Sequence, residues 1–207
     1  MRPEEIERTS FSIIDEEAGR HGFDPEHWAV VRRMIHTTAD FDYLRTVRFH
    51  RRALSEGVRA IRRGCAIVTD TNMARSGIRK APVERFGCRV LCLMEDPAVA
   101  AQAREQGVTR ARAAVDAACG IMESGIYVVG NAPTALLRLL ENIREAKALP
   151  ALVVGLPVGF VNAAESKAAL LEADIPFITN HGRKGGSNVA AAVVNALAIL
   201  AEERILS

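Results

Sequence analysis

Apolar residues in the first sixty positions recur at the spacing of helices. The series from Ile6 to Ala18 predicts a first helix. Asp24 followed by Pro25 is typical of a second helix start, because aspartate caps a first turn and proline fits it. A further helix is expected from Arg51 to Arg63, with Gly64 as its stop. This part of the chain is therefore expected to form a helical N-terminal extension.

Beyond Gly64, short apolar runs alternate with longer helical patterns. Continuous apolar runs indicate strands buried on both faces, and strand–helix alternation implies right-handed crossovers in a parallel sheet. We predict an α/β fold: a three-layer α/β/α domain with roughly five parallel strands, flavodoxin-like order being one candidate. The expected strands are Cys65–Thr69, Arg89–Leu93, Ile126–Val129, Ala151–Gly155 and Pro176–Thr179. The expected helices are Pro97–Gln106, Thr109–Glu123, Pro133–Ala148, Glu165–Ala173 and Gly185–Arg204.

This fold class predicts the place of a site before any motif is considered. Ligands of open parallel sheets bind beyond the carboxyl ends of the strands. The segments expected there are rich in Gly, Asn and Pro, which sharp turns also require, so their composition alone identifies no site. These segments are Asp70–Asn72, Glu95, Gly130–Asn131, Leu156–Gly159 and Asn180–Gly182.

Composition and charge narrow the class of protein. Apolar residues make up 49% of the 207 residues and charged residues 25%, so a core can form and disorder is not expected. The length and the lack of a linker favour one domain over residues 1–207. The 27 basic and 25 acidic side chains give a net charge of +2. This near-balance argues against nucleic acid as a partner, but it allows a local basic pocket for an acidic small molecule.

Targeting and cysteine patterns predict a cytoplasmic protein. No apolar signal core follows the charged first residues, and the longest apolar stretches are too short to span a membrane. Cys65, Cys88, Cys92 and Cys119 form no C-x-x-C pair and have no histidine at zinc-ligand spacing. We therefore expect free thiols in a reducing compartment and no metal site.

Several familiar catalytic and phosphate motifs are missing. There is no P-loop, no G-x-G-x-x-G, no G-x-S-x-G and no H-E-x-x-H, which argues against nucleotide, hydrolase and zinc-protease classes. Gly130–Thr134 follows a strand and opens a helix, but its single glycine is a weak nucleotide signal. A receiver-like signalling domain would need an acidic pocket, which Asp70 and Glu95 are too sparse to form.

Three basic segments are candidate anion sites. Gly182–Asn188 combines glycines, Arg183 and Lys184 with a helix start at Ser187, which suits a carboxylate or phosphate; the alternative is a flexible turn with a serine cap. Arg75–Lys80 and Thr109–Arg112 could be solvated surface charge. If the topology gathers all three at one sheet edge, they fit a ligand with several acidic groups.

The histidine at the end of the second predicted helix is a candidate acid–base group. A helix-end histidine usually has a capping or packing role, and His36 has that alternative. The ordinary pKa of a histidine, about 6.5, makes it usable as a general acid.

Five blocks of sequence belong together: Ser10–Ile14, Met34–Thr37, Gly130–Leu136, Gly155–Val161 with Ala164–Lys167, and Gly182–Ser187. Read together, they resemble the precorrin-8X methylmutase family of cobalamin biosynthesis. The resemblance runs from about Ile6 to the C-terminal helix, and its third and fourth blocks are long and specific.

The resemblance implies an isomerase that moves a methyl group from C-11 to C-12 of a corrin precursor, without a cofactor. It implies a flavodoxin-like fold, a homodimer, and contact with neighbouring pathway enzymes. The alternative is a tetrapyrrole carrier without chemistry, and whether the substrate holds cobalt stays open. The family's catalytic histidine falls on His36. The expected substrate contacts are Ser10, Arg79, Lys80, Arg110, Asn131, Arg183 and Ser187, with Arg79 and Lys80 as alternatives in a segment of variable charge spacing.

Overall fold

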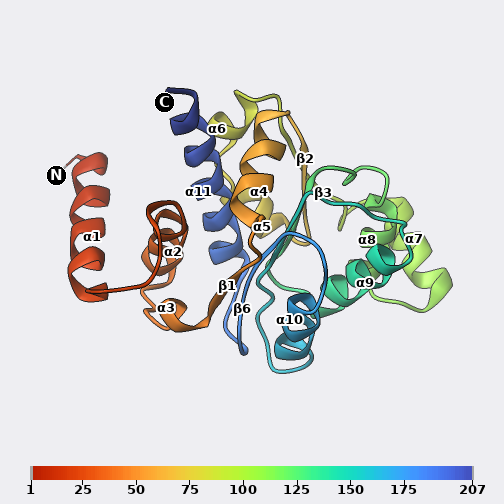
Figure 1. Cartoon of the computed structure of the whole chain (residues 1–207). Helices are drawn as coiled ribbons and strands as arrows, with labels where there is room; N and C mark the ends of the chain where they lie inside the picture. Colours follow the sequence, from red (N-terminus) through yellow and green to blue (C-terminus); the bar gives the residue numbers. More distant parts are fainter. Residues whose placement is uncertain (1, 207) are drawn as a thin grey trace.

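Within residues 2–206, six strands form one mixed sheet, and helices cover both of its faces (Figure 1). The structure is a computed structural model that describes these residues, apart from the side chains of residues 3, 4 and 204–206. The strands lie in the order β1-β6-β5-β4-β2-β3. Their bounds are β1 Val47–Phe49, β2 Ala66–Thr69, β3 Arg89–Cys92, β4 Ile126–Val129, β5 Leu152–Gly155 and β6 Phe177–Asn180.

Five of the strands are parallel, and only β1 runs antiparallel to its neighbour β6. Counted along the chain, the parallel strands have the spatial order 2-1-3-4-5, one of the common orders of doubly wound sheets. The predicted α/β fold is thus confirmed, with one correction. The sixth strand, β1, pairs Val47 with Asn180 and Phe49 with Ile178. Three residues are too few to show a strand period in the sequence.

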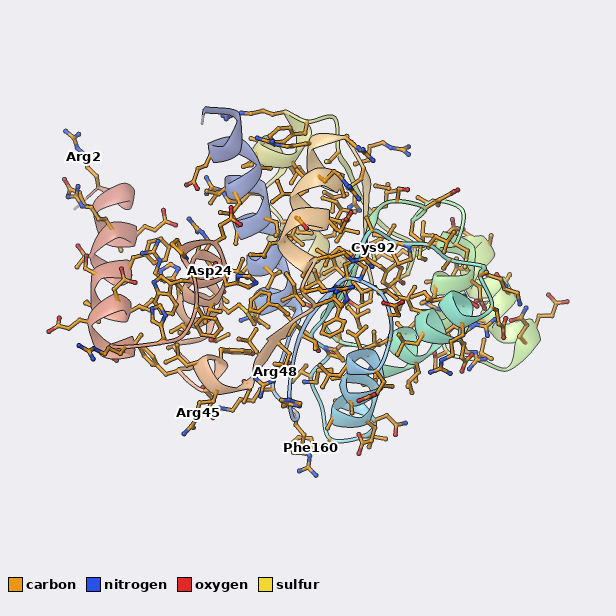
Figure 2. The ribbon with its side chains drawn as sticks, viewed as in Figure 1. Arg2, Asp24, Arg45, Arg48, Cys92 and Phe160 are labelled. Carbon is orange, nitrogen blue, oxygen red and sulfur yellow. The ribbon has the colours of Figure 1, made fainter. Side chains whose placement is uncertain are left out.

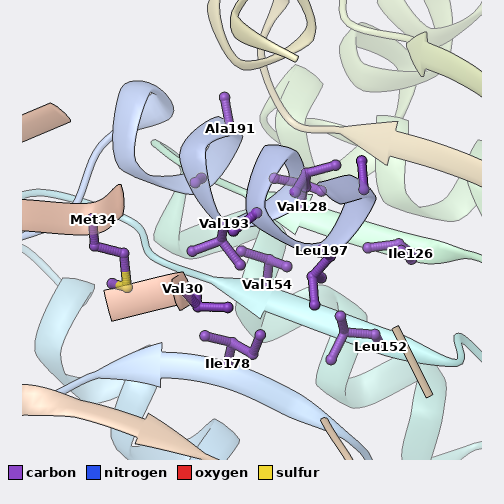
Figure 3. Close-up of a cluster of buried hydrophobic side chains, with 14 of the residues drawn as sticks. Val30, Met34, Ile126, Val128, Leu152, Val154, Ile178, Ala191, Val193 and Leu197 are labelled. Atoms are coloured by element: carbon purple, nitrogen blue, oxygen red, sulfur yellow. The ribbon is translucent and has the colours of Figure 1, made fainter. Parts of the chain in front are cut away.

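One face of the sheet carries the larger part of the core. Ile126 and Val128 of β4 pack there with Val30 of α2 and Leu197 of α11 (Figure 3). Helix α11 is apolar nearly all round because the sheet, α2, α4 and α5 surround it. The helices of this face are α2 Pro25–Thr38, α4 Ala53–Arg62, α5 Asn72–Gly77, α6 Lys80–Glu84 and α11 Ser187–Leu206.

The opposite face is covered by four helices. Tyr127 and Val129 point to this face because successive side chains of a strand alternate, and they pack with Leu136 and Leu139 of α9. The sheet and its two helical layers form the three-layer arrangement that the sequence predicts. The helices of this face are α7 Pro97–Gln106, α8 Arg110–Ala118, α9 Pro133–Arg144 and α10 Ala163–Leu171.

The expected N-terminal extension forms and lies outside α2 (Figure 1). The guanidinium groups of Arg32 and Arg33 lie 4.5 and 5.1 Å from the ring centre of Phe11. Trp28 donates its indole N–H to Asp15 at 2.9 Å. These contacts fix the first helix against the second. The other helices of the N-terminal part are α1 Pro3–Ala18 and α3 Tyr43–Thr46.

Several helix bounds differ from those expected. The helix predicted to reach Ala148 ends at Arg144, because Ala146 adopts a left-handed conformation with φ 55°. The last helix begins at Ser187 rather than Gly185, since Gly186 has φ 139°. The helix predicted to reach Glu123 ends at Ala118, and α5 and α6 occupy residues 72–84, for which no element was expected.

Candidate active site

Ser10 and His36 line the same hollow. It lies between α1 and the C-terminal end of α2 and has a volume of about 440 Å³. Helix α2 ends just beyond His36, where Ala39 takes a left-handed conformation with φ 51°. An open hollow with mostly apolar walls suits one face of a large, flat ligand. Its other lining residues are Ile13, Ile14, Glu17, Ile35, Ala39 and Phe41.

The imidazole of His36 is exposed in this hollow. It meets the ring of Phe11 edge-on, with centroids 5.1 Å apart. Within residues 2–206, neither ring nitrogen of His36 has a hydrogen-bond partner. Ser10 donates its hydroxyl to the carbonyl of Ile6 at 2.8 Å, which leaves its oxygen able to accept. The hollow thus presents a group that can give or take a proton and, beside it, a hydrogen-bond acceptor.

The glycine-rich loop, residues 182–186, follows β6 and precedes α11. In the described part of the chain, the N–H groups of residues 182–185 have no acceptor. Gly186 donates its N–H to the carbonyl of Leu156 at 2.9 Å. A Cβ on Gly185 would lie 2.3 Å from that same carbonyl oxygen, so this close approach requires glycine. The loop is held close to the sheet while its free N–H groups suit an anion.

A buried lysine anchors this loop. Lys167 of α10 is fully buried, and its ammonium donates to the carbonyl of Lys184 at 2.6 Å and to Asn180 Oδ1 at 3.1 Å. Asn180 Nδ2 donates to the carbonyls of Lys184 and His181 at 3.0 and 3.1 Å. Burial lowers the pKa of Lys167 to about 8. No carboxylate among residues 2–206 forms an ion pair with it.

The two basic side chains of the loop differ in their partners. Lys184 pairs with Asp40 and Asp42, each at 2.6 Å, and these hydrogen bonds raise the pKa of Lys184 and lower that of Asp42. Arg183 has no carboxylate partner in residues 2–206, and its guanidinium lies 5.5 Å from the ring centre of Phe160. Of the two, Arg183 is therefore the one available to an acidic ligand.

A second loop at this edge already holds an anion, the carboxylate of Asp70. Asp70 accepts the N–H groups of Gly130, Asn131 and Ala132 at 2.9, 2.8 and 2.7 Å. The side chain is buried, and burial raises its pKa, although the three donors act in the opposite direction. The backbone N–H groups of residues 130–132 are therefore not open to a phosphate, whereas the exposed side chain of Asn131 can meet a ligand.

Side-chain contacts connect these loops along the carboxyl edge of the sheet. Asn188 donates to the carbonyl of Thr37 at 3.4 Å, so the start of α11 touches the helix that carries His36. The hydroxyls of Ser187 and Thr71 lie 2.8 Å apart. Gly130 packs on Ser187 so closely that a Cβ there would lie 2.6 Å from its Cα. Ser187 is therefore buried, and its side chain serves this edge as a structural link.

The remaining residues expected to contact the substrate, Arg110, Arg79 and Lys80, lie in two different places. Arg110 begins α8 beside the start of α9, since the hydroxyls of Thr109 and Thr134 lie 3.4 Å apart. Arg79 and Lys80 lie elsewhere: the N–H of Arg79 donates to Asn195, two helical turns beyond Ser187, or about 12 Å along α11. The three basic segments thus do not all meet at one edge, because α5 and α6 lead the second one away.

Four residues of this region were missed as functional candidates. Asp70 and Lys167 act on loops far away in the sequence, although a lysine between the apolar residues of α10 is a signal of burial. Phe160 and Val161 are 85% and 77% exposed. Figure 2 shows Phe160 projecting from the lower end of the molecule. An exposed aromatic residue beside Arg183 extends the candidate site beyond the glycine-rich loop.

Residues 2–206 contain neither a metal-binding cluster nor a membrane-spanning helix. No group of three or more His, Cys, Asp or Glu side chains is placed to hold a metal ion. In the same residues, no helix has both the length and the hydropathy to cross a bilayer.

Fold and site together define an α/β domain that presents an open histidine and a basic, glycine-rich loop at the carboxyl edge of its sheet. The chain belongs to the precorrin-8X methylmutase family, whose sequence pattern matches residues 5–200. It is accordingly an isomerase of cobalamin biosynthesis, as the names of its relatives indicate.

Relatives match over nearly the whole chain. The cobalt-precorrin-8 methylmutase of Salmonella typhimurium is 48% identical over 203 residues, which cover 95% of each chain. The precorrin-8X methylmutase of Pseudomonas aeruginosa is 39% identical over 196 residues, which cover 93% of each. The crystal structure of precorrin-8X methylmutase from Thermus thermophilus has a TM-score of 0.91 and 48% identity, with 97% of each chain covered.

Proposed function

We propose that the protein moves the methyl group on C-11 of precorrin-8X or cobalt-precorrin-8 to C-12, giving hydrogenobyrinate or cobyrinate. One carbon–carbon bond breaks and one forms within the same molecule, so no methyl donor takes part. His36 is the general acid: it protonates a ring nitrogen, which makes the conjugated system more electrophilic, and takes the proton back after the shift. Such a role contributes about 10²–10⁴-fold to a rate.

The observation that carries this proposal is the state of His36 in its hollow. Its ring is exposed, and both nitrogens lack a partner within residues 2–206, whereas His27 on the same helix is bound to Asp24 at 2.7 Å. A histidine that caps the fold as His27 does has a ring nitrogen engaged, whereas both nitrogens of the exposed His36 ring are available to a ligand. A carrier that only binds tetrapyrrole would have no use for a free imidazole at this position.

The substrate contacts follow from the side chains that remain free. We place Ser10 beside the ring system, Arg183 and the N–H groups of the glycine-rich loop on one carboxylate, and Arg110 and Asn131 on others further along the edge. Arg79 and Lys80 would reach the substrate only through its peripheral chains or across a subunit interface. Ser187 acts through the loop it supports.

The test is the replacement of His36 by alanine. The variant His36→Ala is expected to bind the substrate but to lose about 100-fold or more of its turnover, because the proton donor is gone. Absorption spectra follow the reaction, since the shift changes the conjugation. His27→Asn, on the same helix, is the matched control and should keep its turnover. Wild-type turnover in His36→Ala would refute the general-acid assignment and favour the carrier.

The metal state of the substrate is proposed from the relatives. The curated relatives at 44–48% identity are cobalt-precorrin-8 methylmutases, and the curated precorrin-8X methylmutases are 38–39% identical, although the Thermus thermophilus structure at 48% identity also carries the precorrin-8X name. We infer that cobalt-precorrin-8 is the better substrate. Side-by-side assays with both corrins test this, and a higher kcat/KM for the cobalt-free compound would overturn it.

We further propose a homodimer with shared sites, formed by one domain over residues 1–207 in the cytoplasm. In a single chain the hollow at His36 is shallow and open, and α1 exposes Ile6 and Ile13 to 52% and 50% on the same side as Ser10. A second copy would cover these apolar side chains and wall the ring, and two-fold symmetry would give two equivalent sites. The same edge offers exposed Phe160 for contacts with neighbouring pathway enzymes.

Light scattering and subunit mixing test the dimer. Co-expression of His36→Ala with Arg183→Glu subunits restores activity in some heterodimers if the two residues of one site come from different chains. If each site lies within one chain, no activity returns. A monomeric mass with full activity would refute the dimer.

A further inference from the structure

The charge of Lys167 is unusual for its surroundings. The ammonium is fully buried, and both of its hydrogen-bond partners in residues 2–206, the Lys184 carbonyl and Asn180 Oδ1, are neutral. A buried cation ordinarily pairs with a carboxylate, because leaving water costs several kcal/mol that neutral dipoles only partly return. If the fold needed only packing at this position, an apolar side chain would fill it without the cost of burying a charge.

The position of the charge suggests what balances it. The ammonium of Lys167 donates a hydrogen bond to the peptide carbonyl of Lys184, next to Arg183. The N–H groups of residues 182–185 have no acceptor in the described chain. The Lys184 carbonyl is therefore turned inward to the ammonium, and the unpaired positive charge lies on the inner side of the loop whose N–H groups are free. An anion bound to the loop would supply the missing countercharge from the other side.

We propose that Lys167 is a positioning residue for the methyl shift: it fixes the glycine-rich loop, and its buried charge strengthens the binding of a substrate carboxylate there. This rests on the proposed function, in which that loop binds the corrin. Lys167 does not touch the substrate. It acts through the loop that carries Arg183, so its effect falls on substrate affinity rather than on the chemical step.

Protonation of Lys167 should then be linked to substrate binding. Its pKa of about 8 lies close to working pH, and an anion on the loop would raise it, so binding takes up a proton near pH 8. None of the charged or titratable groups on the surrounding elements forms an ion pair with Lys167 in residues 2–206. These groups are Asp40, Asp42 and Tyr43 across the loop, Glu165 on α10, His181 just before the loop, and Arg183 and Lys184 on the loop itself.

The experiment compares Lys167→Met with Lys147→Met in steady-state assays on the corrin substrate. Lys147 is an exposed lysine that pairs with Glu145 at 2.5 Å, so its loss should leave KM within about twofold of wild type. For Lys167→Met we expect KM to rise about tenfold with little change in kcat, as for loss of one charge acting through the protein near its surface. Wild-type KM should rise above pH 8, and KM of Lys167→Met should not.

A merely structural role would lower the amount of folded enzyme and leave both KM and its rise with pH unchanged in the folded fraction. That result, or a KM equal to that of Lys147→Met, overturns the proposal. If Lys167→Met does not fold, calorimetry of product binding to wild-type enzyme in two buffers at pH 8 decides. Uptake of about half a proton supports the linkage, and no uptake overturns it. Wild-type enzyme without turnover would instead refute the proposed function.

Discussion

Two loops at the carboxyl edge look alike in sequence and differ in their anchors. Both follow a strand, contain glycine and lead into a helix. In the first, residues 130–132, the buried carboxylate of Asp70 accepts hydrogen bonds from the three backbone N–H groups. In the second, residues 182–186, the buried ammonium of Lys167 donates to a backbone carbonyl, and the N–H groups of residues 182–185 stay free in the described chain.

The charge of the buried side chain that holds each loop, Asp70 or Lys167, therefore decides which loop can bind an anion. The acidic side chain occupies the backbone N–H groups of its loop from the inside, whereas the basic side chain binds one loop carbonyl and leaves N–H donors and positive charge for a ligand. A glycine between a strand and a helix is common to both loops, so it cannot by itself identify a ligand site.

Removing the acidic anchor should have the largest effect. Asp70→Ala leaves three N–H groups without acceptors, at about 1–3 kcal/mol each, partly offset because a carboxylate is no longer buried. We expect the free energy of unfolding to fall by about 3–5 kcal/mol in urea titrations. Asp96→Ala, an exposed helix cap that accepts one N–H at 2.8 Å, is the control and should cost about 1 kcal/mol. Equal losses would remove the distinction between a closed and an open loop.

Charge reversal in the open loop should affect binding. Arg183→Glu is expected to raise KM by about 10–100-fold, because a charge-assisted contact of about 1.5–3 kcal/mol is replaced by repulsion. The measurement is KM and kcat at low salt, with Arg104→Glu on the remote helix α7 as control. Unchanged affinity would show that the loop binds no carboxylate.

The basic anchor predicts a pH dependence of stability. Lys167 has a pKa of about 8 in the folded protein and about 10.4 in an unfolded chain, so between these values the unfolded chain binds more protons. The free energy of unfolding should therefore gain up to about 1.4 kcal/mol per pH unit from this group as pH rises from 8 toward 10. Urea titrations at both pH values should show that gain in wild type and in Lys147→Met. Its persistence in Lys167→Met would contradict the assignment.

The smallest effect is expected at the closed loop. The N–H of Asn131 is bound to Asp70, so only its neutral side-chain amide can meet the substrate. Asn131→Ala should cost at most about 0.5–1.5 kcal/mol of binding, or less than tenfold in KM. A loss as large as that of Arg183→Glu would mean that both loops hold charged groups of the substrate.

Much of the fold could be predicted from local signals. The five parallel strands were found from continuous apolar runs, and capped starts such as Asp24 and Thr109 are where helices begin. The short elements β1, α5 and α6 gave no periodic signal. That failure had a consequence for the site, because α5 and α6 carry Arg79 and Lys80 away from the edge.

The site was predictable only in part. The sequence resemblance singled out Ser10 and His36, and the structure places them in one hollow. The roles of Asp70 and Lys167 depend on contacts with distant segments. Asp70 meets a loop sixty residues later, and Lys167 is buried only once α10 packs beside β6. Such contacts are set by topology, and a single sequence does not contain that information in local form.

The antiparallel strand β1 has a consequence for the synthesis of the protein. His181 donates its N–H to the carbonyl of Thr46, and His50 donates to that of Phe177, so the segment after His36 is fixed by β6, the last strand in residues 2–206. The hollow at His36 and the glycine-rich loop are likewise brought together by the start of α11. Contacts of such high sequence separation form late and slowly. A nascent chain therefore has no assembled site until β6 and the start of α11 have been synthesised.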